Sequence, residues 1–136
     1  MDKTLLRILD ANSNRAREAL RVCEEITRFV LNHRSFSLQL KKVRHEVTRV
    51  IQQLPLSYKD LLKMRESKDD VGNDMALYPK GNVGKRDLLI SNMKRAQEAV
   101  RVLEEFSKVV SKKASKKFQR IRFQLYQLEK KIILKL

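Results

Sequence analysis

The sequence predicts an all-α fold, a four-helix bundle built from two tandem αα-hairpin repeats with pseudo-two-fold symmetry. Three observations support this expectation. Apolar residues recur at helical spacing through most of the 136 residues. All three glycines and one of the two prolines fall within residues 72–84, which concentrates irregular structure in one connector. Finally, a stretch of the first half of the chain recurs in the second half.

The first predicted helix covers about residues 8–31. Its apolar face carries Ala16, Ala19, Val22, Cys23, Ile26, Phe29 and Val30. A second helix covers about residues 36–54 and ends at Pro55, because proline lacks the N–H group that a helix interior requires. The remaining helices are expected at about residues 57–64, 86–111 and 115–135. Each long hairpin has one apolar stripe, so only packing of the two hairpins completes a core.

An offset of 80 residues aligns residues 9–30 with residues 89–110, and 11 of these 22 positions are identical. Unrelated sequences would share about one or two. The repeated polar pairs include Asn12/Asn92, Arg15/Arg95, Glu18/Glu98, Arg21/Arg101 and Glu24/Glu104. We therefore expect a single domain over residues 1–136, with repeats at about 5–54 and 85–136 and a connector at 55–84.

The net charge is +15, from 31 Lys and Arg against 16 Asp and Glu, and it predicts attraction to polyanions or phosphorylated ligands. Nine of the cations lie within residues 111–136, against Glu129 alone. Solvated lysines such as Lys130 and Lys131 on a final helix explain this excess without a partner. Two alternatives remain: a basic nucleic-acid-binding module, although the chain lacks aromatic residues arranged to stack bases, and a helical scaffold.

Cysteine usage and hydropathy predict the compartment. Cys23 is the single cysteine, so no internal disulfide can form. The sequence opens without a signal-peptide pattern and contains no apolar run of about 18 residues that would suggest a membrane span. We expect a soluble cytoplasmic protein without a membrane partner, and the sequence leaves a homo-oligomer open.

Asn12 and Arg15 fall on the apolar face of the first helix, near its expected start, and Asn92 and Arg95 repeat this arrangement. Polar groups at such positions must find partners, because burying them unpaired costs several kcal/mol. Free N–H groups at helix starts also favour phosphate. The pattern predicts a site for each of two phosphate-bearing ligands. The alternatives are helix-terminus or interhelical hydrogen bonds for the asparagines and buried ion pairs with carboxylates for the arginines.

Several other residues are candidates for the same pockets. Glu18 and Glu98 lie three residues after the repeated arginines, where an i,i+3 pair could orient the guanidinium. Arg44 and Arg122 lie beside the apolar stripes of the second and fourth helices. His45 is a conceivable general base because its pKa is ordinarily near neutral, although it falls off the stripe. Arg21, Glu24 and their repeats Arg101 and Glu104 are interpreted as solvated, outward-facing charges.

The connector carries a second group of candidate residues. Asp69, Asp70 and Asp74 offer hard oxygen ligands, which suit Mg²⁺ bound through carboxylates and substrate phosphates. Gly72 permits a close backbone approach, and a solvated acidic turn is the alternative. The spacing does not match an EF-hand, and the sequence contains no Walker loop, dinucleotide-binding fingerprint, C-x-x-C or H-E-x-x-H motif.

Four segments in order carry a family resemblance. They are Ile8 to Glu18, Leu40 to Glu46, Asp69 to Gly72, and Asn92 to Glu105. Together they resemble the small hydroxymethylpyrimidine phosphate kinase family of thiamine biosynthesis, which occurs alone or fused ahead of thiamine phosphate synthase. The likeness spans essentially the whole chain. Because the chain ends soon after the last predicted helix, we expect a free-standing copy.

The resemblance implies transfer of the ATP γ-phosphoryl group to the monophosphate of 4-amino-5-hydroxymethyl-2-methylpyrimidine, with Mg²⁺, and a functional link to thiamine phosphate synthase. It also assigns roles to the candidate residues. It implies phosphate or pyrimidine contacts from Asn12, Arg15, Asn92 and Arg95. Glu18 and Glu98 would orient these residues or bind the pyrimidine. The site would be completed by Arg44, His45, Asp69 and Asp70. The predicted catalytic group is thus Arg15, Arg95, His45 and Asp69, with Arg122 and Gly72 among the phosphate-binding residues and Asp69 and Asp70 as metal ligands.

Overall fold

The computed structural model describes residues 2–73, 78 and 80–136. Five α-helices and one π-helical turn make up the described part of the chain, which contains no strand. The helices are α1 (Lys3–Glu25), α2 (Arg34–Gln52), α3 (Tyr58–Met64), α4 (Lys85–Ser107) and α5 (Lys112–Ile133), and the π-helical turn Ile26–Val30 follows α1. The predicted all-α fold is confirmed. No helix in this described part is long and apolar enough to cross a membrane.

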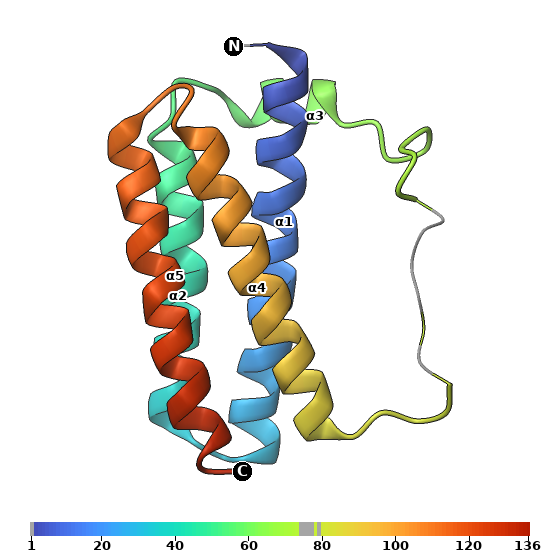
Figure 1. The fold of residues 1–136 in the computed structure, drawn as a ribbon, viewed down its shortest axis with the longest axis vertical. Coiled ribbons are helices and arrows are strands. Elements are labelled where there is room, and N and C mark those ends of the chain that lie inside the picture. The colour runs from blue at the N-terminus through green and yellow to red at the C-terminus, as the bar shows by residue number, and fades with distance from the viewer. Residues whose placement is uncertain (1, 74–77, 79) are drawn as a thin grey trace.

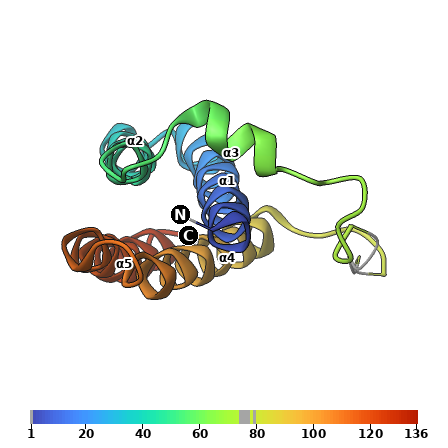
Figure 2. The same cartoon turned by 90° about the horizontal axis from the view of Figure 1, so that it is seen from above.

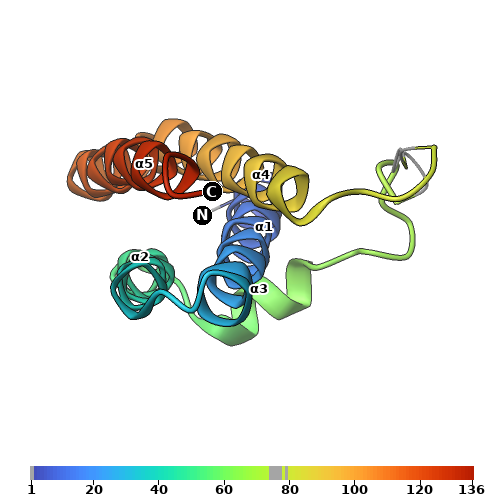
Figure 3. The same ribbon diagram turned by 90° about the horizontal axis from the view of Figure 1, so that it is seen from below.

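The four long helices form a bundle made of two hairpins, α1 with α2 and α4 with α5 (Figure 1). Helices α1 and α4 run antiparallel and pack against each other, while α2 and α5 form the other side of the bundle. Figures 2 and 3 show the connector on the far side of α1 and α4 from α2 and α5. Among the described residues, no long helix covers this face of the α1/α4 pair.

Helix boundaries follow local capping more closely than hydrophobic periodicity. The Asp2 carboxylate accepts a hydrogen bond from the Leu5 N–H at 2.8 Å, and α1 therefore begins several residues before the predicted position. Ser57 and Asp60 form the capping box of α3, as the predicted start at residue 57 requires. Ser111 caps α5 by accepting from the Ala114 N–H at 3.1 Å, so α4 ends at Ser107 rather than near residue 111.

The core consists of aliphatic side chains from all four long helices, including fully buried Leu9, Leu40, Leu103 and Leu125. Cys23 lies within this core, as predicted, with its Sγ 3.9 Å from the carbonyl oxygen of Leu89. Burial raises the pKa of its thiol to about 12, because the thiolate would lose its hydration. At the contact between α1 and α4, the small residues Ala16 and Ala96 are fully buried, which allows the two backbones to approach closely.

Each hairpin also contains one buried ion pair, at equivalent positions of the two repeats. Arg44 of α2 donates to both carboxylate oxygens of Glu24, and Arg122 of α5 donates to those of Glu104 at 3.1 and 3.2 Å. Glu24 and Glu104 are only 6% and 5% exposed. The expectation that these glutamates face solvent is therefore wrong, because each meets an arginine of the adjacent helix. Arg21 and Arg101 are exposed, as predicted.

Candidate functional site

A groove of about 630 Å³ runs along the uncovered face of α1 and α4. Its lining comprises five residues from each helix, and the two sets are equivalent in the sequence repeat. They are Asn12, Arg15, Glu18, Ala19 and Val22 of α1, with Asn92, Arg95, Glu98, Ala99 and Val102 of α4. The two repeats thus contribute equivalent residues to one symmetric groove. The two predicted phosphate sites form the two ends of one groove.

The spacing of the groove residues follows from the antiparallel packing. Because Cys23 lies beside Leu89 and the helices run in opposite directions, residues 16 and 96 are level at the centre. With a rise of 1.5 Å per residue, Arg15 and Arg95 are separated by only about 3 Å along the helix axis. Asn12 and Asn92 are separated by about 12 Å on the same basis. The arginines therefore flank the centre of the groove, the asparagines lie farther out, and Val22 and Val102, separated by about 18 Å on the same basis, mark its ends.

The two asparagines are buried, as predicted, and each is 6% exposed. Their side-chain amides donate to the carbonyl oxygens one turn earlier, Asn12 to Ile8 at 2.9 Å and Asn92 to Leu88 at 2.8 Å. These bonds satisfy part of each amide within its own helix, whereas the alternative interpretation of the sequence expected bonds at a helix terminus or between helices. They also hold the side chains in fixed positions at the groove wall.

The two arginines are exposed, and the expectation that they are buried is wrong. The inward side of α1 is occupied by Leu9, Ala16 and Leu20, so Arg15 is displaced to the flank that borders the groove. The expected proximity to a helix start is also wrong. Helix α1 begins at Lys3, about 2.5 turns before Asn12, and free N–H groups are confined to the first turn. Any phosphate in this groove would be bound by side chains.

Arg15 and Arg95 have no carboxylate partner among the described residues. Arg15 makes only a long contact of 3.5 Å to the Asn12 Oδ1, and neither arginine forms an ion pair in that part of the chain. The predicted pairing with Glu18 and Glu98 is absent there as well. Glu18 and Glu98 line the same groove without forming ion pairs with these arginines, so both guanidinium groups remain available to donate hydrogen bonds to an anionic ligand.

A second cleft of about 390 Å³ adjoins the Asn12 end of the groove and shares Asn12 and Arg15 with it. The start of the connector forms one side, contributing Arg65, Glu66, Ser67 and Asp70, while α1 contributes Arg7. Arg65 attaches the connector to α1 by donating two hydrogen bonds to Asp10, both of 2.8 Å. This bidentate bond raises the pKa of Arg65. Sequence reasoning missed this pair, although Asp10 stands where the second repeat has Ile90.

The aspartates of the connector differ in their surroundings. Asp70 lines the cleft, and its Oδ1 accepts the Gly72 N–H at 2.8 Å. Asp69 is exposed and does not line the cleft. Asp74 and Pro79 lie outside the described residues. Within the described chain, no group of three or more His, Cys, Asp or Glu side chains could hold a metal ion, so a metal here would depend on ligand phosphates for most of its coordination.

Three other predicted site residues lie away from the groove. Arg44 and Arg122 are engaged in the buried ion pairs on the side of α2 and α5. Arg122 also donates to the Tyr126 hydroxyl at 3.1 Å, and this bond is the main cause of its raised pKa. His45 is exposed on α2. The groove is lined from α1 and α4, so the structure does not bring these three residues together with Arg15 and Arg95.

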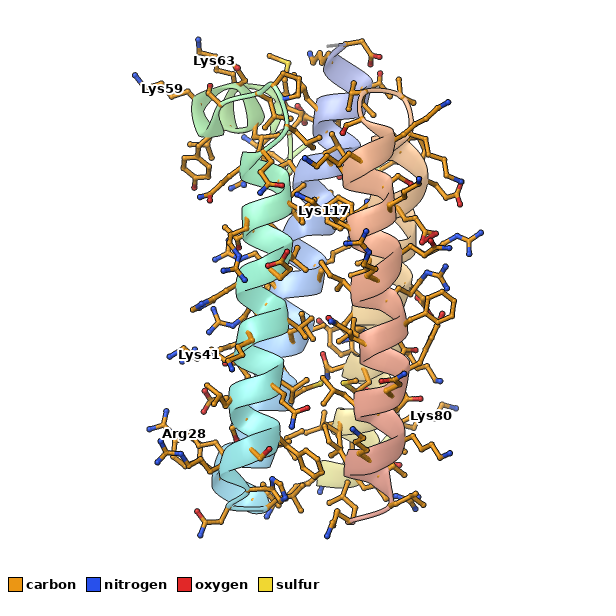
Figure 4. The ribbon with its side chains drawn as sticks, turned by 90° about the vertical axis from the view of Figure 1, so that its left-hand side faces the viewer. Arg28, Lys41, Lys59, Lys63, Lys80 and Lys117 are labelled. Carbon is orange, nitrogen blue, oxygen red and sulfur yellow. The ribbon has the colours of Figure 1, made fainter. Side chains whose placement is uncertain are left out.

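A different groove, of about 440 Å³, lies between α2 and α5, and the charged residues that line it are predominantly basic. Its cationic lining residues are Lys42, Arg49, Lys117, Arg120 and Lys131. Figure 4 shows this side of the bundle, with Lys117 between the two helices and Lys41 on the outer side of α2. Arg49 is paired with Glu46 within α2, and Lys117 with Gln53. This basic groove and the Asn/Arg groove therefore lie on different faces.

Comparison with known proteins assigns the family. The ThiD2 family matches residues 7–131. The chain belongs to the ThiD2 family. The match covers both repeats and the connector, and therefore all ten groove residues of this ThiD2 member. No solved structure matches the chain significantly.

The chain is also similar to curated enzymes of thiamine biosynthesis. It is 33% identical over 135 residues to the thiamine-phosphate synthase of Nostoc punctiforme, covering 98% of this chain and 36% of that protein. It is 36% identical over 126 residues to the thiamine-phosphate synthase of Synechocystis sp., covering 92% and 35%. The enzyme of the same name from Prochlorococcus marinus is 36% identical over 137 residues, covering 99% and 37%. The ThiD2 chain therefore spans about a third of the length of these relatives.

Proposed function

We propose that this ThiD2 family member transfers the γ-phosphoryl group of ATP to the monophosphate of 4-amino-5-hydroxymethyl-2-methylpyrimidine, forming the diphosphate in thiamine biosynthesis. The relatives named thiamine-phosphate synthase support the pathway. The observation that carries the proposed reaction is the symmetric groove, in which two asparagines and two unpaired arginines from the repeats converge. Two phosphorylated substrates would enter from the two ends, and their phosphates would meet between Arg15 and Arg95.

The chemistry suits such a site. An oxygen of the pyrimidine monophosphate attacks the γ-phosphorus, a new P–O bond forms, and the bond between the γ-phosphorus and the β,γ-bridging oxygen breaks, so that ADP leaves with the electron pair. Phosphoryl transfer depends mainly on positioning and on positive charge around the transferred group. Arg15 and Arg95 would supply that charge at the centre of the groove.

This reaction needs no general base. The second pKa of a phosphate monoester is about 6, so the attacking oxygen is already deprotonated at neutral pH. The position of His45 on α2, outside the groove, is therefore compatible with the reaction. The unphosphorylated alcohol would differ from the monophosphate as an acceptor in two ways. Its hydroxyl group would have to lose a proton, and one of the two arginines would have no phosphate to bind. We propose that the enzyme accepts the monophosphate and not the free alcohol.

Asp70 is the residue best placed to hold Mg²⁺. Its carboxylate lines the cleft that also contains Arg15, and Mg²⁺ commonly binds through one or two carboxylates together with substrate phosphates. The metal would neutralise charge on the phosphates. Asp69, one residue earlier, does not line the cleft and would contribute less, although the sequence alone did not distinguish the two.

The decisive experiment is a coupled assay of ADP release. With Mg-ATP present, the purified protein should release ADP when the pyrimidine monophosphate is added, and the pyrimidine diphosphate should appear in equal amount. The unphosphorylated alcohol is the matched control and should give no ADP above background. If the alcohol is used as well as the monophosphate, the proposed role of paired phosphates is wrong. If neither substrate releases ADP, the proposed kinase reaction is wrong.

The basic groove between α2 and α5 favours one alternative, a nucleic-acid-binding module. Binding of this kind would weaken steeply with salt, because each phosphate contact releases counterions. Retention of RNA or DNA at physiological salt that is lost in Lys42→Glu and Arg120→Glu variants would support it. Lys41→Glu, on the outer side of α2, is the control.

A further inference from the structure

The two ends of the α1/α4 groove are equivalent in the repeat but differ in their surroundings. The Asn12 end continues into the connector cleft, through the residues that both share. Arg7 lines this cleft, and its equivalent in the second repeat is Asp87, an acidic residue in the first turn of α4. Asp10, which holds the connector through Arg65, is equivalent to the apolar Ile90. The connector therefore breaks the symmetry at one end only.

Charge distinguishes the two ends further. The cleft at the Asn12 end contains two acid–base sets. Arg65 is paired with Asp10, while Arg7 and Arg15 lie in the same lining as the carboxylates of Glu66 and Asp70. A magnesium-bound triphosphate requires several cationic contacts and an oxygen ligand for the metal. At the Asn92 end, Arg95 lies in the groove, and Asp87 replaces the second cation. That end suits a ligand with a single phosphate.

Each end of the groove offers an apolar wall for a flat ring, from Ala19 and Val22 at the Asn92 end and from Ala99 and Val102 at the Asn12 end. The wall therefore admits the ring at the Asn92 end, while the connector and Arg7 distinguish the two ends. Because the helices are antiparallel, Asn92 is level with residue 20 of α1, between Ala19 and Val22. Small ligands commonly occupy sites with an apolar wall and a few fixed polar groups. The buried Asn92 amide, held by its bond to Leu88, is such a group.

We infer that the groove has a fixed polarity: the nucleoside triphosphate binds at the Asn12 end and extends into the connector cleft, and the aminopyrimidine monophosphate binds at the Asn92 end. This inference rests on the proposed function. Arg7 is then a specificity-determining residue for the nucleotide, and the connector distinguishes two otherwise similar half-sites.

Val22 and Val102 provide a matched test, because they are equivalent residues at opposite ends of the groove. Val22 lies at the Asn92 end and Val102 at the Asn12 end. A carboxylate at either position would repel the phosphate bound beside it. We expect Val102→Asp and Arg7→Ala to raise the KM for Mg-ATP about tenfold, with the KM for the pyrimidine monophosphate within about twofold. Val22→Asp should show the opposite pattern.

The mirrored result, or equal effects of both valine variants on both KM values, would overturn the assigned polarity. Thermal melts followed by circular dichroism identify any variant that fails to fold. If the higher KM for ATP in Arg7→Ala results from the lost positive charge, Arg7→Lys should have a KM closer to that of the wild-type protein. Binding of a non-hydrolysable ATP analogue with Mg²⁺, measured by calorimetry, tests the inference without turnover. Weaker binding of the analogue to Arg7→Ala, but not to Val22→Asp, supports the assigned polarity. If the protein shows this pattern but forms no ADP, the proposed reaction is rejected while the polarity of the groove stands. No analogue binding to the wild-type protein, or the reverse pattern, overturns it.

Discussion

Arg95 and Arg122 belong to the same repeat but differ in environment, and alanine substitutions should therefore have opposite effects on stability and activity. The side chain of Arg122 is 10% exposed and donates to both oxygens of Glu104, whose side chain is 6% exposed. Arg95 is exposed and has no ion pair within the described residues. The structure thus separates an arginine that stabilises the fold from one that is available to a ligand.

The expected magnitudes follow from burial. Removing one partner of a buried ion pair leaves an uncompensated charge and costs about 3–5 kcal/mol. For a chain of this size, that loss lowers Tm by about 10–20 °C. Arg122→Ala should behave in this way. Arg95→Ala should change the free energy of unfolding by less than about 0.5 kcal/mol, since it removes no buried contact. Its turnover should fall about 100- to 1,000-fold, because it loses a charge that stabilises the transition state.

Thermal denaturation followed by circular dichroism, together with the coupled ADP assay, measures both quantities on the same preparations. The double variant Glu104→Leu with Arg122→Met is the control, because an apolar pair of similar size should recover most of the lost stability. Near wild-type turnover in Arg95→Ala would refute the catalytic role of the groove centre. A Tm loss in Arg95→Ala equal to that in Arg122→Ala would show that the groove arginines are structural.

The remaining predictions concern the connector, the core and the basic surface. Asp70→Asn should raise the Mg²⁺ concentration needed for half-maximal rate with little change in Tm. Asp69→Asn is the matched control and should raise that Mg²⁺ concentration less. Equal effects of the two variants would contradict the proposed role of Asp70 in the cleft. Asp10→Ala should speed tryptic cleavage after Lys68, because Arg65 of the connector loses its hydrogen bonds to α1. An unchanged rate of cleavage would show that other contacts hold the connector in place. Cys23 should resist thiol reagents until the protein unfolds. Burial raises the pKa of this thiol from its ordinary value of 9.0 to about 12 in the folded protein. The thiol therefore contributes stability below pH 9 that is lost as the pH rises toward 12, and Cys23→Ala should lose stability less steeply over that range. Lys130→Ala should keep turnover within about twofold, since exposed charges contribute little.

The sequence was sufficient to predict the helices and the duplication. Helical periodicity is a local property, and an internal repeat is visible in the residues themselves, so the bundle and the positions of α2, α3 and α5 could be expected to within a few residues. The boundaries of α1 and α4 were less accurate, because Asp2 and Ser111 determine them through hydrogen bonds that periodicity does not register.

The arrangement of the candidate site could be predicted only in part. The repeat identified Asn12, Arg15, Glu18 and their equivalents, and the tertiary structure places all six in one groove. A helical wheel did not distinguish the inward side of α1 from the flank that faces α4. It therefore placed Arg15 in the core and Glu24 in solvent, and the structure shows the reverse.

The amino-acid sequence by itself determined the helices, the two-fold repeat and the residue types available for binding phosphate, because these depend on neighbours along the chain. Only the tertiary structure decided which arginines are paired and which are free among the described residues, because Glu24 and Glu104 meet arginines of the adjacent helices. It also decided that the two repeats share one groove, since antiparallel packing of α1 against α4 brings Arg15 and Arg95 together from positions 80 residues apart. Contacts between distant segments have no signature in local periodicity, and they convert two similar helices into one candidate site.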